Sequence, residues 1–200
     1  MARQRGHHRR RSLQRRVNVR ELRQRFLIVC EGEKTEPNYF NSFRVPGVVI
    51  DVRGIGQNTV RLVKRAIKLM EEDDYDQVWC VFDRDIFPLK NFNAALRLAE
   101  KHGIKVAYSN EAFELWYVLH FNYHQSATAR HLYVGMLNDL LGVPYEKNRL
   151  DMYEQLEGKQ EKAIRNAERL LQNYDPPDPA RNNPSTTVHL LVQELNRFAV

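Results

Sequence analysis

Short, unbroken runs of hydrophobic residues occur at intervals along the first half of the chain. Four of these runs end in polar residues or turns, at 26–31, 48–52, 78–83 and 104–109. A run that is apolar on both faces is typical of a strand buried inside a parallel sheet. We therefore predict four strands in this half of the chain.

Between these runs, hydrophobic residues take the three- and four-residue spacing of helices. A short helix is predicted to start near Glu36, because Pro37 is tolerated in a first turn. Two apolar stripes predict longer helices, one formed by Val60, Val63, Ile67 and Met70 and the other by Phe92, Ala95, Leu96 and Ala99. This alternation predicts an α/β fold, with a mostly parallel sheet flanked by helices and joined by right-handed crossovers.

The pattern beyond residue 110 is helical. Residues 112–121 are apolar on nearly every side, which predicts a helix packed deep in the protein, and helices are also predicted at 129–141 and 158–174. Asn183 can cap a last helix that has Pro184 in its first position. The apolar stripe of that helix is Val188, Leu191, Val192 and Leu195.

Charge is distributed unevenly along the chain. The net charge is +6, but residues 1–25 hold ten Arg and one acid, Glu21, so this segment carries +9 and the rest −3. Such a segment suits a polyanion, because Arg–phosphate contacts release condensed counterions. A solvated tail without a partner is the alternative. The arginines that we expect to bind nucleic acid are Arg9, Arg10, Arg11, Arg15 and Arg16.

These patterns divide the chain into three predicted parts. They are an Arg-rich disordered arm at 1–25, an α/β core at 26–125 and a helical C-terminal extension at 126–200 packed on the core. No run reaches the ~20 apolar residues of a membrane span, and no apolar segment follows the N-terminal charges. Cys30 and Cys80, the two cysteines, lie in apolar runs and are expected to be buried free thiols. We therefore predict a cytoplasmic protein without a membrane partner.

Three acidic residues follow the predicted strands. Glu31 ends the first strand, and Asp83 and Asp85 end the third. Residues i and i+2 of an extended chain point to the same side, so both aspartates can converge while Arg84 points away. Ligands of open α/β sheets bind outside the carboxyl ends of the strands. Carboxylates without His or Cys suit Mg²⁺ or Mn²⁺.

The alternative is that these acids are helix caps or solvated loop residues, and an Asp-x-Asp pair alone is a weak signal. The combination carries more weight, because the segment 31–36 forms a compact acidic turn with a single lysine, Lys34. No Gly-Lys-Ser/Thr loop for nucleotide phosphates is present. His120 and His124 have helical spacing, but ordinary core and surface histidines are the favoured interpretation over zinc ligands.

Together these motifs are recognisable. An apolar strand ending in Glu-Gly, with a later strand ending in Asp-x-Asp, resembles the Toprim domain of topoisomerases, primases and the overcoming-lysogenization-defect nucleases. More narrowly, residues 27–40 resemble the opening signature of the RloB-like family. Its second signature is similar to 113–116 with 119–121, and its C-terminal motif is similar to 183–186. The resemblance covers nearly the whole chain.

The resemblance implies a Toprim-like core, a role in bacterial antiviral defence and often an ATPase partner protein. Carried over by position, Glu31 is the Toprim glutamate, and Asp83 with Asp85 is the aspartate pair. Glu36 matches a further acid after the Glu-Gly turn, and so a further metal ligand. Lys34 is expected to neutralise charge developing on a phosphate, with a solvated loop lysine as the alternative.

Glu114 stands out because it lies within an apolar helix, between Phe113 and Trp116. A buried acid is costly unless it is paired or bound to a metal. We expect Glu114 to orient a metal ligand or to accept a hydrogen bond from Lys34 or an arginine. The alternative is that it lies on the one wet face of its helix.

The sequence therefore predicts a Mg²⁺- or Mn²⁺-dependent nuclease of the Toprim class that hydrolyses RNA, tRNA included, or DNA in antiviral defence. The alternative is a non-catalytic nucleic-acid-binding or regulatory subunit of a defence complex. A primase-like or topoisomerase-like enzyme ranks last, because the 200 residues leave no room for the additional domains of those enzymes. The sequence leaves open the choice of nucleic acid and whether the chain forms a homo-oligomer.

Overall fold

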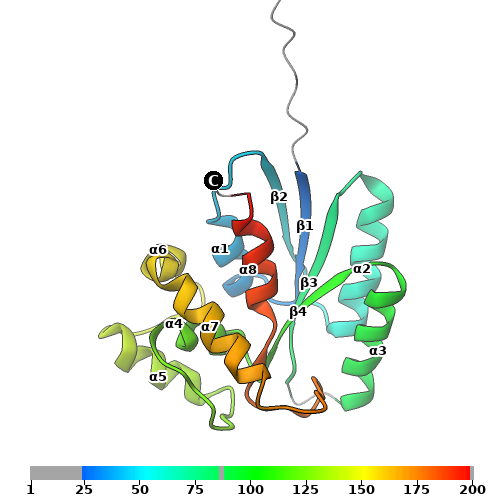
Figure 1. Cartoon of the computed structure of the whole chain (residues 1–200). Coiled ribbons are helices and arrows are strands. Elements are labelled where there is room, and N and C mark those ends of the chain that lie inside the picture. The colour runs from blue at the N-terminus through cyan, green and yellow to red at the C-terminus, as the bar shows by residue number, and fades with distance from the viewer. Residues whose placement is uncertain (1–23, 86–87, 199–200) are drawn as a thin grey trace, which may run out of the picture.

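A mostly parallel, five-stranded sheet forms the centre of the computed structural model, which describes residues 24–85 and 88–198 (Figure 1). The order of the strands across the sheet is β2-β1-β3-β4-β5. Four strands are parallel, and β5 runs antiparallel to β4. Their bounds are Gln24–Cys30 for β1, Val48–Gly54 for β2, Gln77–Asp83 for β3, Lys105–Asn110 for β4 and Ser185–Thr186 for β5. The predicted α/β fold is confirmed.

The described helices cover both faces of the sheet (Figure 1). They are α1 (Thr35–Asn41), α2 (Thr59–Glu72), α3 (Leu89–Lys101), α4 (Glu114–Phe121), α5 (Leu132–Leu141), α6 (Met152–Leu156), α7 (Gln160–Leu171) and α8 (Val188–Asn196), with a 3₁₀ turn at Glu157–Lys159. Helices α2 and α3 pack together on one face, and α1 and α8 lie on the other. The C-terminal part beyond α4 is helical apart from β5, as predicted.

Strand β1 is buried on both faces and supplies both layers of the core. Phe26, Ile28 and Cys30 join the cluster beneath α1, α4 and α8, whereas Leu27 and Val29 join the cluster beneath α2 and α3. This alternation follows from the two-residue period of a strand. It explains why the run is continuously hydrophobic, as expected for a central parallel strand.

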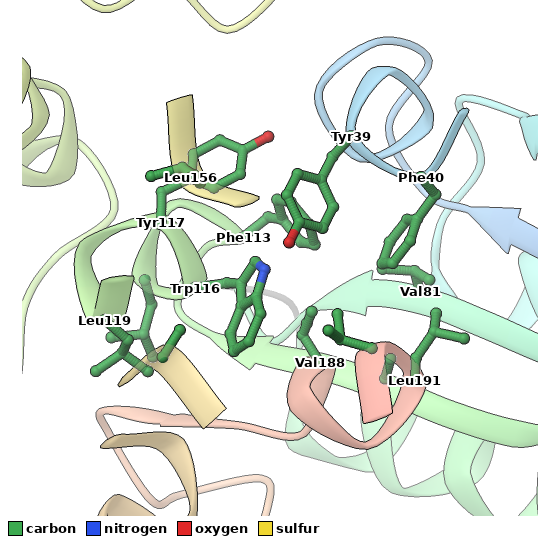
Figure 2. Packing of buried hydrophobic residues seen from close by; sticks show 14 of the residues in the cluster. Tyr39, Phe40, Val81, Phe113, Trp116, Tyr117, Leu119, Leu156, Val188 and Leu191 are labelled. Carbon is green, nitrogen blue, oxygen red and sulfur yellow. The ribbon is translucent and has the colours of Figure 1, made fainter. Parts of the chain in front are cut away.

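The larger core cluster joins segments far apart in the sequence. Figure 2 shows Tyr39 of α1 and Trp116 of α4 pointing toward each other, with Val188 of α8 beside the indole and Leu191 farther from it, on the side of Val81. These side chains are nearly or fully buried. Because this cluster combines residues from 26–125 and 126–200, the two predicted parts share a core, and the boundary at residue 125 stays a prediction.

The apolar face of α2 differs from its predicted stripe. Leu62, Val63, Ala66 and Leu69 are its buried hydrophobic residues, whereas Met70 is 36% exposed. The predicted residues and the residues that are buried in the structure both follow helical spacing, because the apolar stripe of α2 is wide. Packing against α3 buries the side of this stripe that is centred on Leu62 and Ala66. Of the predicted stripe, Val63 is buried, and Val60 and Ile67 are partly buried against the same cluster, so only the placement of Met70 was wrong.

The start of the last helix was also predicted wrongly. Ser185 and Thr186 form β5, which pairs with Asn110 and Ser109 of β4, and α8 begins only at Val188. Strand pairing satisfies backbone groups that a longer helix would have left at this sheet edge. The predicted stripe of α8 is confirmed, because Val188, Leu191, Val192 and Leu195 are all buried.

Two further expectations concern the cysteines and the membrane. Cys30 and Cys80 are buried, free thiols on adjacent strands, as predicted. Within residues 24–85 and 88–198, each helix is too short or too polar to cross a membrane.

Candidate metal and nucleic-acid site

The carboxyl ends of β1 and β3 lie side by side and bring Glu31 and Asp83 together. Parallel pairing sets Cys30 opposite Val81, so the residues after these strands share one edge of the sheet. The backbone N–H of Asp83 donates a hydrogen bond to Glu31 Oε2 at 3.1 Å. The backbone N–H of Glu31 donates to the Val81 carbonyl at 2.8 Å. Sheet pairing thus fixes the position of the first predicted acid.

A pocket of about 440 Å³ opens at this edge, and charged residues form most of its wall. Its six acids are Glu31, Glu33, Glu36, Asp83, Asp85 and Glu114, and its three cations are Lys34, Arg130 and Lys147. All five residues predicted as catalytic, and all four predicted as metal ligands, therefore line one cavity. Carboxylates outnumber cations by two to one here, so the pocket attracts additional positive charge.

The turn between β1 and α1 folds Glu36 back over the strand end. Glu36 is only 5% exposed, and its Oε1 accepts a hydrogen bond from the Gly32 backbone N–H at 3.3 Å. A Cβ atom at Gly32 would lie 2.3 Å from Glu36 Oε2. Only glycine therefore allows the carboxylate of Glu36 to approach this turn so closely.

Asp83 and Asp85 share one cation, Arg130, from the turn before α5. Nη2 of Arg130 lies 3.6 Å from Asp83 Oδ2, and Nη1 lies 3.4 Å from Asp85 Oδ2. Arg84 instead donates from Nε to the Ala180 carbonyl at 2.8 Å. The two aspartates therefore face one side of the chain while the intervening Arg84 reaches another, as the i and i+2 spacing predicted.

Glu114 is buried at the start of α4 and does not face solvent. Its Oε1 accepts a hydrogen bond from the Tyr145 hydroxyl at 3.3 Å and lies 3.6 Å from Lys147 Nζ. The expectation of a paired acid is confirmed. The suggestion of Lys34 or an arginine as its partner is wrong, because Tyr145 and Lys147 occupy that role. Lys34 lines the pocket but is exposed to solvent.

Burial and mutual repulsion raise the pKa values of three carboxyl groups in the pocket. Burial raises the pKa of Glu31 from 4.5 to about 7, and the charges of Asp85 and Glu36 add to the rise. The pKa of Asp83 is raised by burial and then by the charges of Glu36 and Glu114. Burial also raises the pKa of Glu36. The site favours either bound protons or a bound cation over a full set of bare carboxylates.

The carboxylates stand apart in this arrangement. Within residues 24–85 and 88–198, no three His, Cys, Asp or Glu side chains are placed so that they could hold a metal ion. A cation at the strand ends would therefore require some side chains to draw together. The donor chemistry suits a hard divalent ion, because the pocket offers carboxylate oxygens and neither His nor Cys.

Sequence reasoning missed three residues of this site: Arg130, Tyr145 and Lys147. All three lie in turns or loops between helices, where the hydrophobic pattern carries no information. The backbone of the loop that contains Lys147 is hydrogen-bonded to α1. Thr35 Oγ1 donates to the Lys147 carbonyl at 2.7 Å, and Asn38 Nδ2 donates to the Asn148 carbonyl at 3.2 Å. Only the tertiary fold shows that Lys147 reaches the pocket.

The predicted nucleic-acid-binding arginines, Arg9, Arg10, Arg11, Arg15 and Arg16, lie outside the described residues. Their role stays a prediction.

Comparison with known protein families identifies the family of this chain. The family model described as RloB-like protein matches residues 26–195, which include every described residue of the pocket named above. No curated protein and no solved structure matches the chain.

Proposed function

The chain belongs to the RloB-like family, and from this membership and the acidic pocket we propose that it is a metal-dependent nuclease. The observation that carries the proposal is the gathering of Glu31, Glu36, Asp83 and Asp85 at the carboxyl ends of two central strands. Burying several carboxylates at one point costs free energy. A protein keeps such an arrangement where a cation or a reaction uses it.

We assign the metal ligands to Glu31, Asp83 and Asp85, with Glu36 in support. Mg²⁺ and Mn²⁺ are the ions that such oxygen ligands favour. A bound ion of this kind supplies an activated water and stabilises the leaving oxygen of a phosphodiester. The raised pKa values of Glu31 and Asp83 support this assignment, because a cation removes the repulsion that contributes to them.

The residues of the chain itself divide into an acidic floor and a cationic rim. Lys34 and Lys147 are exposed at the pocket wall, so they can meet a phosphate group before it reaches the acids. Tyr145 and Lys147 keep the charge of Glu114 compensated, which orients this carboxylate toward the pocket. The predicted arm at 1–25 would add sequence-independent affinity for the phosphate backbone.

The wider setting follows from the family resemblance. We propose a Toprim-like core, a cytoplasmic role in antiviral defence, and an ATPase partner protein. RNA, tRNA included, is the first substrate to test, with DNA as the second.

The deciding experiment is cleavage of labelled tRNA, single-stranded RNA and DNA with Mg²⁺ or Mn²⁺. Wild type is compared with Asp83→Asn, which keeps the size of the side chain but removes its charge. We expect cleavage by wild type and a loss of at least about 100-fold in the variant, because transition-state charge stabilisation is lost. The matched control is Asp74→Asn, an exposed acid in the loop before β3, at the end of the sheet opposite the pocket, which should retain full activity.

Two results would change the proposal. Equal cleavage by wild type and Asp83→Asn would remove the acids from the reaction. Metal binding without cleavage of any substrate would favour the regulatory-subunit alternative, or a requirement for the ATPase partner.

A further inference from the structure

Arg130 takes the place between Asp83 and Asp85 where a shared cation would bind. We propose that it is an exchangeable cation: its guanidinium holds the two carboxylates until a divalent ion displaces it, and then binds the substrate phosphate at the rim of the pocket. This inference rests on the proposed function, because it assumes that a metal binds these aspartates. It assigns Arg130 two successive partners.

The geometry of the ion pairs supports the first role. One guanidinium spans both aspartates, with Nη2 facing Asp83 at 3.6 Å and Nη1 facing Asp85 at 3.4 Å. Both contacts are longer than the 2.7–2.9 Å of a strong charge-assisted hydrogen bond. Arg130 is therefore held by charge more than by a tight bidentate hydrogen bond, and a small cation can replace it.

Burial differs between the partners in the way that an exchange requires. The Asp83 and Asp85 side chains are 15% and 13% exposed, whereas the Arg130 side chain is 40% exposed. The acids are thus fixed at the floor of the pocket, and the guanidinium already borders solvent. Its displacement leaves a charged group in water and creates no buried, unpaired charge.

The backbone of Arg130 is held in place independently of its side chain. Its N–H donates to Glu111 Oε2 at 3.0 Å, and Glu111 Oε1 accepts a hydrogen bond from Asn183 Nδ2 at 3.2 Å. Glu111 thus ties the turn before α5 to the end of β4 and to the segment before β5. A displaced guanidinium remains attached at the rim and stays within reach of whatever occupies the pocket.

The exchange has a simple electrostatic basis. Arginine keeps its proton at any ordinary pH, so Arg130 and a metal ion are both cations competing for the same carboxylate oxygens. In this arrangement Asp83 and Asp85 both have Arg130 as an ion-pair partner. After exchange, the planar fork of the guanidinium suits two oxygens of a phosphate, which a lysine could not match.

The first test measures Mn²⁺ affinity in the full-length protein without nucleic acid, by isothermal titration and by electron paramagnetic resonance. Removing the competing cation in Arg130→Gln should tighten Mn²⁺ binding by about five- to tenfold. Arg130→Lys keeps the charge and should lie close to wild type. The charge-matched control is Arg165→Gln on the exposed surface of α7, which should leave Mn²⁺ affinity unchanged.

The second test measures cleavage at saturating Mn²⁺. Arg130→Gln should then cleave at least about tenfold more slowly than wild type, because the variant lacks the guanidinium that binds two oxygens of the substrate phosphate. Tighter metal binding combined with slower cleavage is the signature of the exchange. A merely structural role for Arg130 would lower both quantities, together with the melting temperature.

The outcomes separate the two proposals. Mn²⁺ binding that is absent in wild type, or that survives Asp83→Asn unchanged, would overturn the proposed function. Mn²⁺ binding that depends on Asp83 but is unchanged or weakened in Arg130→Gln would overturn the exchange and leave the nuclease proposal standing.

Discussion

The acidic pocket and the helical core beneath α8 both bury titratable groups, and burial favours the uncharged form in both, but the consequences near pH 7 differ. In the helical core, His120 stacks edge-on against Trp116 with ring centroids 4.7 Å apart, and its Nδ1 lies 2.8 Å from the Trp116 carbonyl. Burial lowers the pKa of His120 to about 4, so it is neutral at pH 7. In the pocket, burial raises the pKa of Glu31 to about 7, so this group sits at the edge of ionisation.

The difference indicates which region is built for packing and which for chemistry. A neutral histidine that donates to a carbonyl four residues earlier carries no charge that a cation would have to neutralise, although the buried Nε2 of His120 has no hydrogen-bond partner among the described residues. A set of buried carboxylates repels itself and is completed only by protons or a cation. Both regions place polar groups inside the protein, but only the pocket holds more carboxylates than cations.

The largest effect that we expect is a loss of protein stability at low pH, caused by protonation of His120 in the helical core. The unfolded chain binds a proton at pH 6.5, whereas folded His120 does so only near pH 4, so the free energy of unfolding falls as pH drops through this window. A shift of this size corresponds to a loss on the order of 3 kcal/mol. Urea unfolding of wild type and His120→Gln between pH 7 and pH 4 measures it.

In His120→Gln the acid loss should shrink by that amount. His189, whose pKa is also lowered by burial, should retain its own smaller contribution in the same direction. Identical pH profiles for the two proteins would mean that His120 becomes protonated without unfolding.

The pocket should respond to pH with the opposite sign. The folded pKa of Glu31, about 7, exceeds its ordinary 4.5, so its contribution to stability is complete below pH 4.5 and is lost as pH rises through 7. Glu31→Gln should therefore stabilise the metal-free protein at pH 8 by about 2 kcal/mol, a value reduced for the partial exposure of this carboxylate. Urea unfolding in EDTA at pH 5 and pH 8 measures the change.

Added Mg²⁺ supplies the control for this prediction. The ion should raise the stability of wild type at pH 8 and leave Glu31→Gln nearly unchanged, because only the wild-type site gains its cation. A stabilisation of Glu31→Gln that is equal at both pH values would show that ionisation of the buried Glu31 carboxyl group is not its cause.

The sequence predicted the acidic floor of the pocket because strand ends are set by local pattern. Glu31 and Asp83 directly follow continuous hydrophobic runs, and parallel pairing of those runs brings their ends together. A general rule of open α/β sheets then placed the ligand site at that edge. The positions of these two acids could therefore be predicted without knowing how the loops fold.

The rim of the pocket could not be predicted in this way. Arg130 is 45 residues from Asp85 along the chain and lies in the turn before α5, where a single arginine gives no signal in the sequence. Strand β5 has only two residues and no hydrophobic run, so it is defined by its hydrogen bonds to β4 alone. Both features depend on how the C-terminal part packs, which hydrophobic spacing does not encode.

The smallest effect comes from a pair of glycine substitutions in the two regions. Gly32→Ala places a Cβ 2.3 Å from Glu36 Oε2, so the carboxylate must move, and we expect a loss of about 1 kcal/mol together with weaker Mn²⁺ binding. Gly135→Ala is the matched control, because its Cβ meets nothing within 4 Å in the middle of α5. It should gain up to about 1 kcal/mol of stability, since alanine favours the helix. Thermal melting with Mn²⁺ titration separates the two variants, and unchanged Mn²⁺ affinity in Gly32→Ala would remove Glu36 from the metal site.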